Sequence, residues 1–362
     1  MRKHYLDNIR WITVLLVLIY HVIYMYNGVQ LFGVIGPFRE VQYQDAYQYL
    51  VYPWFMALLF VVSGISAKYY LDGHDTREFI RTRTRKLLVP STLGLLVFQW
   101  IQGYYNMQIG DAFSTMPMDQ IPRPVVWLIM SVSGTGVLWY IQTLWILSLL
   151  LIPVRKLEKG RLSALCEKVN LPILLLLTVV VYPMAHILNT PVITVYRFGL
   201  YGFCFFAGYF IFSNESVIER VEKAWPVLTV MALASGIGYT ILYFGENYAA
   251  EPTINCPLAC VYCWLGILAM LAVGKRFLDR TSGIGNWMNQ KAWGLYMFHY
   301  LPISMVAFYL REAGFGNAFL SYFLCLIAGF WGAILLYEVI RKIPILRWFV
   351  LGIRKEKTHV QG

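Results

Sequence analysis

The chain has 362 residues, of which 59% are hydrophobic and only 14% are charged. Soluble proteins average roughly 45–50% apolar and about 25% charged residues. A soluble fold of this length could not hide so much apolar surface behind so few charges. The same composition excludes collagenous, disordered and nucleic-acid-binding chains, although the net charge is +11. The sequence therefore predicts an all-α integral membrane protein.

Apolar stretches of the right length predict where the chain crosses the membrane. A spanning helix needs about 20 mostly apolar residues to cross roughly 30 Å of hydrocarbon, and on that criterion about ten spans are predicted. Aromatic residues crowd many of their ends, as expected at a membrane interface. In chain order the predicted spans are 11–27, 49–70, 87–104, 137–154, 171–188, 195–212, 225–244, 257–273, 292–310 and 319–340.

The distribution of Lys and Arg predicts the orientation of these spans. With the N-terminus inside, all but four of the 30 Lys and Arg residues fall in inside segments. This asymmetry predicts that both termini are cytoplasmic, and it explains the basic charge without any nucleic acid. We expect a single transmembrane domain over residues 1–345 and a basic cytoplasmic tail over 346–362. The four exceptions are Arg39, Arg123, Arg197 and Arg311.

Arg10 and His21 on the first predicted helix are candidate functional residues, because ionisable groups in or at the edge of a membrane are costly and usually functional. Their separation corresponds to about 1100° of helical rotation and about 16 Å of rise, so both side chains share one face. We expect Arg10 at the inner headgroups and His21 at mid-membrane. That geometry suits an anionic carrier held at the inner surface beside a base at mid-depth. The alternative is a snorkelling Arg and a buried, hydrogen-bonded His.

His299 is a second candidate within a predicted span. It lies eight residues beyond Lys291, which places it roughly 12 Å from the inner side, and Tyr296 precedes it by one turn. Two histidines at similar depth predict a shared polar chamber. A structural hydrogen bond made by His299 is the alternative.

The densest basic run is Arg-Thr-Arg-Thr-Arg-Lys at 81–86, in a predicted inner loop. The simplest interpretation is the charge bias that sets topology, together with contacts to lipid headgroups. The alternative is a site for a multiply phosphorylated ligand, because the guanidinium fork matches phosphate oxygens.

Three of the six cysteines, Cys256, Cys260 and Cys263, cluster at the outer end of a predicted span. No His lies adjacent to them. We therefore expect small apolar helix residues there rather than metal ligands or disulfide partners, and we predict no metal site.

Five stretches in chain order resemble the acyltransferase 3 family, bacterial membrane O-acyltransferases that modify glycans. The Arg10 to His21 spacing matches the family's R-x10-H signature. The basic run that ends at Pro90 resembles the family's Arg-rich cytoplasmic loop. The other stretches are Phe-Val-Val-Ser-Gly at 60–64, Leu-Trp-Tyr at 138–140 and Leu-Tyr-Met-Phe-His at 295–299. They are similar to the family's Phe-x-x-Ser-Gly, Leu-Trp-Phe and Tyr-Leu-x-His segments, and together the stretches span nearly the whole chain.

The resemblance implies acyl transfer from cytoplasmic acyl-CoA to an acceptor hydroxyl, in a multi-pass protein of a bacterial plasma membrane. The catalytic residue would act as a general base or carry the acyl group transiently. The implied roles are catalysis for His21, donor binding for Arg10, Arg81 and Arg85, and a polar chamber formed by His299, Tyr296, Trp139 and Ser63.

The resemblance also implies which molecules this chain meets. No cofactor would be bound; acyl-CoA, with acetyl-CoA as the expected form, would be a co-substrate. The acceptor would be a hydroxyl group of a cell-surface glycan or of a related molecule. Many members carry His before the Leu-Trp pair, where this chain has Val137. Some members carry an additional extracytoplasmic domain that delivers the acyl group. We expect this chain to act directly on its acceptor or to work with a separate extracytoplasmic partner.

Two other classes of function are left open by the residues themselves. A secondary transporter would use the mid-membrane His and Arg as proton-relay or substrate-binding groups. Against it, the predicted spans lack paired Gly- or Pro-broken helices at corresponding positions of two halves. A structural membrane subunit would use His21 and His299 only for packing.

Overall fold

The computed structural model describes residues 3–30, 33–115, 120–190 and 195–354. Helices make up 80% of the protein, and the described residues contain no strand beyond an isolated bridge between Asn189 and Arg197. The all-α prediction is confirmed. The α-helices are α1 (His4–Tyr24), α2 (Ala46–Val51), α3 (Phe55–Gly73), α4 (Thr76–Arg83), α5 (Val89–Gly94), α6 (Trp100–Ile109), α7 (Ala112–Thr115), α8 (Arg123–Ser133), α9 (Trp139–Glu158), α10 (Arg161–Glu167), α11 (Leu171–Leu176), α12 (Thr178–His186), α13 (Phe198–Ala207), α14 (Glu215–Lys223), α15 (Trp225–Tyr243), α16 (Pro257–Leu278), α17 (Gly283–Phe298), α18 (Tyr300–Glu312), α19 (Ala318–Ile327), α20 (Ala333–Lys342) and α21 (Pro344–Leu351).

Some neighbouring α-helices are joined by turns of other geometry. The π-helical turns are Thr84–Leu88, Leu95–Gln99, Gly208–Phe212 and Ala328–Gly332, and the 3-10 turns include Tyr43–Asp45, Gly136–Leu138 and Thr253–Asn255. Continuous helical stretches are therefore longer than single α-helices, and they include Thr76–Ile109 and Ala318–Lys342.

Seven helical stretches of the described chain are long and apolar enough to cross a membrane, and an eighth is counted if a pair bent by 113° forms one span. Two of the predicted spans differ from this picture. Phe198–Phe212 is among the shorter apolar helices, and the predicted span 292–310 is divided at His299 between α17 and α18. The count of about ten, from the length criterion, and the cytoplasmic termini stay predictions.

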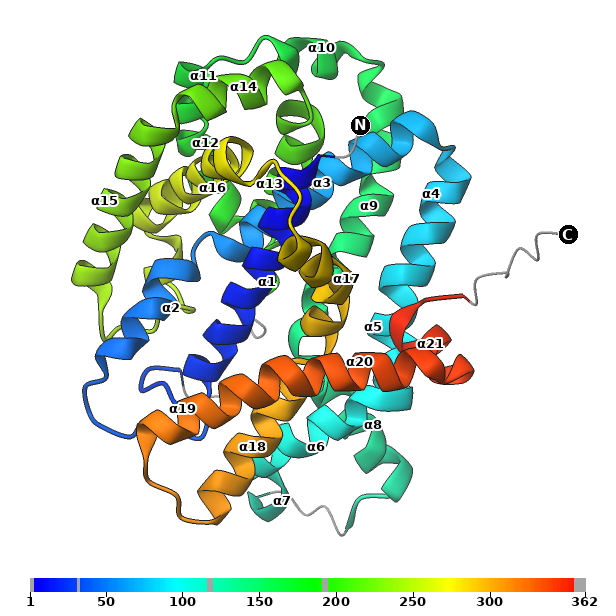
Figure 1. Ribbon diagram of the computed structural model, residues 1–362, viewed down its shortest axis with the longest axis vertical. Helices are drawn as coiled ribbons and strands as arrows, with labels where there is room; N and C mark the ends of the chain where they lie inside the picture. The colour runs from blue at the N-terminus through cyan, green and yellow to red at the C-terminus, as the bar shows by residue number, and fades with distance from the viewer. Residues whose placement is uncertain (1–2, 31–32, 116–119, 191–194, 355–362) are drawn as a thin grey trace, which may run out of the picture.

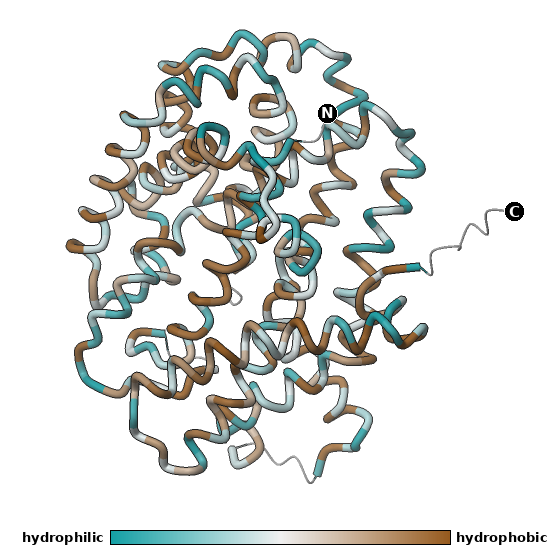
Figure 2. Tube along the Cα trace, viewed as in Figure 1, coloured by the Kyte–Doolittle hydropathy of each residue, from teal (hydrophilic) through white to brown (hydrophobic). Residues whose placement is uncertain are grey.

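Helix α1 runs through the interior of the bundle and carries both candidate residues of the first span. It packs against α3, α16 and α17, and Figure 1 shows it in dark blue near the centre of the molecule. Hydrophobic residues follow most of its length in Figure 2. Its buried side chains include Ile9, Val17 and Leu18. This packing fixes the position of α1, and with it the positions of Arg10 and His21 along the helix.

A close contact between α3 and α13 explains one of the quoted motifs. A Cβ atom on Gly64 would lie 2.0 Å from the carbonyl oxygen of Phe205, and one on Gly208 would lie 2.1 Å from that of Val61. Neither position has room for a side chain, so glycine lets the two backbones touch. The Phe-Val-Val-Ser-Gly stretch thus has a packing role, and it fixes the position of Ser63.

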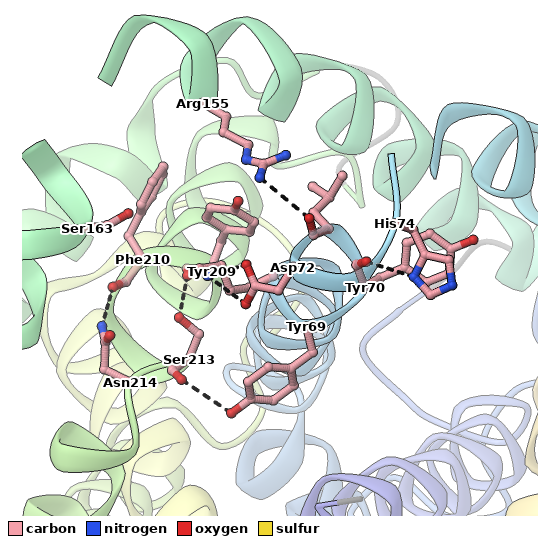
Figure 3. A network of polar contacts seen from close by, with 12 residues as sticks. Tyr69, Tyr70, Asp72, His74, Arg155, Ser163, Tyr209, Phe210, Ser213 and Asn214 are labelled. Atoms are coloured by element: carbon pink, nitrogen blue, oxygen red, sulfur yellow. Dashed lines mark hydrogen bonds and ion pairs between the residues drawn. The ribbon is translucent and has the colours of Figure 1, made fainter. Parts of the chain in front are cut away.

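Polar contacts fasten the end of α3 to its neighbours, as Figure 3 shows. An Arg155 Nη2 atom donates to the carbonyl oxygen of Leu71 at 3.5 Å. The Tyr69 hydroxyl donates to the carbonyl oxygen of Ser213 at 3.3 Å, and the Ser213 hydroxyl donates to that of Tyr209 at 2.6 Å. These contacts link α3 to α9 and to the turn after α13.

The predicted domain boundary at residue 345 falls inside α21. This helix packs against α5, and a Cβ on Gly94 would lie 3.0 Å from the carbonyl oxygen of Phe349. Part of the predicted tail is therefore packed on the bundle. Its last residues, 355–362, lie outside the described chain.

Candidate active site

Two histidines from distant parts of the chain meet in the interior. His21 comes from α1, and His299 lies at the junction of α17 and α18. The Nε2 atom of His299 is 3.1 Å from the Nδ1 atom of His21, and the ring centroids are 5.0 Å apart. His299 is fully buried. The structure thus brings together the two histidines that the sequence places at similar depth.

The surrounding carbonyl groups determine which nitrogen of each neutral ring carries hydrogen. Nδ1 of His299 lies 2.8 Å from the carbonyl oxygen of Leu295 and 3.1 Å from that of Tyr296. A nitrogen that faces carbonyls must donate, so Nε2 of His299 holds the lone pair. Nδ1 of His21 faces that lone pair and also the carbonyl oxygen of Val17, at 2.8 Å. It must therefore donate too, which leaves the basic lone pair of His21 on Nε2.

His21 lines a small chamber, of about 180 Å³, which we call the histidine chamber. The predicted residues Trp139 and Tyr296 line it as well. Tyr24 and Tyr300 also line it, and the Tyr300 ring centroid is 4.9 Å from that of His21. Aromatic rings form most of its wall, and His21 is the only imidazole among the described residues that line it.

A second space, of about 570 Å³, lies beside the first turns of α1, and we call it the basic cavity. The cations that line it within the described chain are Arg10, Arg83 and Lys86. Nη1 of Arg10 is 3.0 Å from Oδ1 of Asp7, and Nη2 donates to the Ser66 hydroxyl at 3.0 Å. Both contacts hold the Arg10 guanidinium at the wall of the cavity.

Tyr296 stands between the two spaces, because its side chain lines both. Its hydroxyl donates to the carbonyl oxygen of Val137. Tyr140 packs beside it at 5.6 Å between ring centroids, and the Tyr140 hydroxyl is 2.8 Å from that of Ser63. Ser63 accordingly lines the basic cavity rather than the histidine chamber.

The two spaces follow one face of α1. Arg10 and Val14 line the basic cavity, and Val17 and His21 line the histidine chamber. Intervals of three and four residues keep side chains on one face of a helix. The face that the sequence predicts for Arg10 and His21 is therefore the face that both spaces share.

The basic run contributes cations other than the predicted pair. Arg83 and Lys86 line the basic cavity, whereas Arg81 is exposed and Arg85, partly buried, is not among the lining residues. The run passes from α4 into the π-helical turn Thr84–Leu88, which has more residues per turn than an α-helix and so rotates the side chains that follow it. Arg81 and Arg83 both precede that turn, in α4, and two residues along an α-helix are about 200° apart. Spacing therefore puts them on different faces but does not say which face meets the cavity.

Several uncharged residues of the site were also missed. Asn289 and Trp293 of α17 line the basic cavity, and Tyr24 and Tyr300 line the histidine chamber. The position of Tyr24, three residues after His21 on the same helix, is a signal that could have identified it. Asn289 and Trp293 lie on α17, and nothing in the sequence pattern indicated that this helix packs against α1.

The described residues contain no group of three His, Cys, Asp or Glu side chains arranged to hold a metal ion. Cys256, Cys260 and Cys263 are free thiols. The sulfur of Cys256 accepts a hydrogen bond from the backbone N–H of Ala259 at 3.3 Å, which caps the start of α16.

Comparison with protein families matches residues 3–338 to a family model described as an acyltransferase domain. The chain belongs to the acyltransferase 3 family. It is therefore a membrane acyltransferase, which argues against the transporter and structural-subunit alternatives. Comparison of this acyltransferase with curated proteins and with solved structures gives no match. Within the acyltransferase, the residues of the R-x10-H signature lie in two adjoining spaces, Arg10 in one and His21 in the other.

Proposed function

We propose that this acyltransferase moves an acetyl group from acyl-CoA, bound in the basic cavity, to a hydroxyl group of a cell-surface glycan at His21. The observation that carries the proposal is the arrangement of the two spaces. One is lined by cations, the other is lined by His21, and Tyr296 forms a wall of both.

The basic cavity suits a CoA donor in charge, surface and size. Arg10, Arg83 and Lys86 offer charged donors to phosphate oxygens, and the two guanidinium groups add a matching fork geometry. The Trp293 and Tyr140 rings also line this cavity and offer aromatic surface to the base of the donor. A volume of about 570 Å³ falls within the usual range of ligand pockets, roughly 300–1,000 Å³.

The chemical step needs a base beside the thioester. The acceptor hydroxyl gives its proton to Nε2 of His21 while its oxygen attacks the thioester carbonyl carbon. The new C–O bond forms, the C–S bond breaks, and the imidazolium returns the proton to the CoA thiolate. Nothing is oxidised or reduced, and the imidazole ends the cycle neutral.

The contact with His299 supports this direction of proton transfer. Because Nε2 of His299 accepts from Nδ1 of His21, the proton of the neutral His21 ring stays on Nδ1. The same lone pair faces the positive charge that develops on His21 when Nε2 takes the acceptor proton. His299 would therefore orient the base and stabilise its charged form.

The size of the histidine chamber favours a short acyl group. About 180 Å³ is shared with the acceptor oxygen, and aromatic rings form most of the wall. Within the described chain, no Lys or Arg lines this chamber. An acyl group with a free carboxylate would therefore find no cation on the chamber wall to pair with, so we propose acetyl.

Radiolabel transfer tests the function directly. Inside-out vesicles from bacterial cells that produce the protein are given [14C]acetyl-CoA, and label is measured in the glycan fraction. We expect label that depends on the protein and that mild alkali releases, as an O-ester requires. Vesicles without the protein are the control. Equal labelling in both, or label that resists alkali, would contradict the proposal.

A further inference from the structure

A third space adjoins the histidine chamber on the side away from the basic cavity. It measures about 430 Å³, and we call it the distal chamber. Tyr24, Gly136 and Tyr300 line both it and the histidine chamber. Because they share three residues, the two spaces are neighbours. A molecule in the distal chamber therefore lies closest to His21 where these residues line it.

The order along α1 separates the distal chamber from the donor side. Arg10 lines the basic cavity, His21 lines the histidine chamber, and Tyr24, at the last position of the helix, lines the distal chamber. The distal chamber also takes residues from the end of α6, such as Met107. A substrate that enters here reaches His21 from the opposite direction to the donor.

The lining of the distal chamber carries no formal charge. Among the described residues that line it there is no Lys, Arg, Asp, Glu or His. Asn106 and Ser133 are its polar side chains apart from the tyrosines. The amide Nδ2 of Asn106 donates to the carbonyl oxygen of Ser133 at 2.8 Å, which joins α6 to α8 and fixes this wall.

Two charged residues at the end of α6, Arg311 and Asp111, do not line the distal chamber. Arg311 donates from Nη1 and Nη2 to the carbonyl oxygens of Ile109 and Gln108, both at 3.1 Å, so it caps the end of α6. Asp111 is exposed, and its backbone carbonyl accepts from the hydroxyl groups of Ser114 and Thr115. A charged group in the distal chamber would therefore find no charged partner among the described residues that line it.

We infer that the distal chamber is the acceptor subsite and that it selects an uncharged, hydroxyl-bearing molecule. This inference rests on the proposed function, because the acceptor is defined by the reaction at His21. The Tyr24 and Tyr300 rings offer faces to the apolar side of a sugar-like acceptor, and the amide and hydroxyl groups offer hydrogen bonds. Acceptors that carry a carboxylate or phosphate at the reacting unit are excluded.

Thiol labelling tests the charge selectivity of the chamber with small probes in place of the acceptor. Ser133→Cys places a thiol in the distal chamber, and Ser114→Cys places one on the exposed helix α7 as the matched control. Each protein is treated with a neutral methyl, an anionic sulfonatoethyl and a cationic trimethylammonium methanethiosulfonate. The wild type measures background, for which Cys256 is the cysteine that is not buried.

We expect the charged reagents to modify Ser133→Cys at least about tenfold more slowly than the neutral one, after normalisation to Ser114→Cys, because no described side chain of the chamber can pair with their charge. Modification by the neutral reagent should abolish label transfer to the endogenous acceptor in vesicles, with acetyl-CoA binding unchanged. Equal rates for the three reagents, or full transfer after modification, would overturn the inference. Failure of the unmodified wild type to transfer label would instead refute the proposed function.

Discussion

The basic cavity and the histidine chamber adjoin each other at Tyr296 but differ in almost every physical property. The basic cavity is large and lined by cations, among them Arg10 and Arg83, whereas the histidine chamber is small and walled by aromatic rings. The difference separates binding from chemistry. The cations line the space that we assign to the phosphate-bearing donor, and the base lies among aromatic rings. Substitutions in the two regions should therefore change different kinetic constants.

The sharpest test of that separation is His21 itself. His21→Gln keeps a hydrogen-bonding side chain but removes the base. We expect kcat for acyl transfer to fall by about 10²–10⁴-fold, with acetyl-CoA affinity within a factor of about two. Transfer assays and isothermal titration on the same preparation measure both. His186→Gln is the matched control, because His186 is exposed on α12 and its Nδ1 makes the same type of backbone contact, 2.8 Å from the carbonyl oxygen of Tyr182. Near-normal acyl transfer by His21→Gln would show that His21 is not the catalytic base.

His299 should have the next largest effect, and on kcat rather than on donor binding. His299→Phe removes the acceptor for Nδ1 of His21 but leaves the base, so we expect a loss of about 10–100-fold. His299→Gln can still accept through its amide oxygen and should recover part of that loss.

A spectroscopic signature separates this positioning role from a purely structural one. In 15N NMR of histidine-labelled protein, His21 should carry its hydrogen on Nδ1 in the wild type and populate both tautomers in His299→Phe. A wild-type spectrum with the hydrogen on Nε2 would contradict the assigned direction of the contact. Loss of activity with an unchanged tautomer would leave His299 only a structural role.

The donor side should respond through KM. Arg83→Gln removes a cation from the basic cavity, and we expect the KM for acetyl-CoA to rise by about tenfold, as loss of one charged hydrogen bond predicts. Arg81→Gln, two residues away and exposed, should change KM by less than about twofold. Steady-state kinetics at low and high salt give both values. A larger rise in KM for Arg81→Gln than for Arg83→Gln would assign donor binding to Arg81, as predicted from the sequence, and remove Arg83 from the donor site.

The smallest expected effect is on stability at the base of α1. Burial alone would raise the pKa of Glu215, but hydrogen bonds and attraction from Lys3 and Lys275 hold it below its usual value. A carboxylate with a lowered pKa stabilises the fold above its unfolded pKa and loses that contribution as the pH falls through the folded value. We expect Glu215→Gln to lower Tm by on the order of 1 °C at pH 7 and to have no effect near pH 3, by scanning calorimetry in detergent. A drop that persists at pH 3 would show a packing effect instead.

The fold class and one face of the site could be predicted from composition and from spacing along a single helix. Composition alone indicated an all-α membrane protein, since backbone groups in lipid must be satisfied within each segment. Arg10 and His21 share a face because eleven residues come close to a whole number of helical turns, a property that does not depend on any neighbour.

The residues that complete the site depend on neighbours and could not be predicted in this way. Arg83 rather than Arg81 lines the basic cavity, because the packing of α4 decides which of its faces meets that space. The proton position on His21 depends on the carbonyl oxygen of Val17 in α1 and on the ring of His299, which lies 278 residues further along the chain. Periodicity along the chain determines which face a residue occupies, whereas the tertiary packing decides what that face meets, because hydrogen bonds and cavities are formed between segments that the sequence keeps apart.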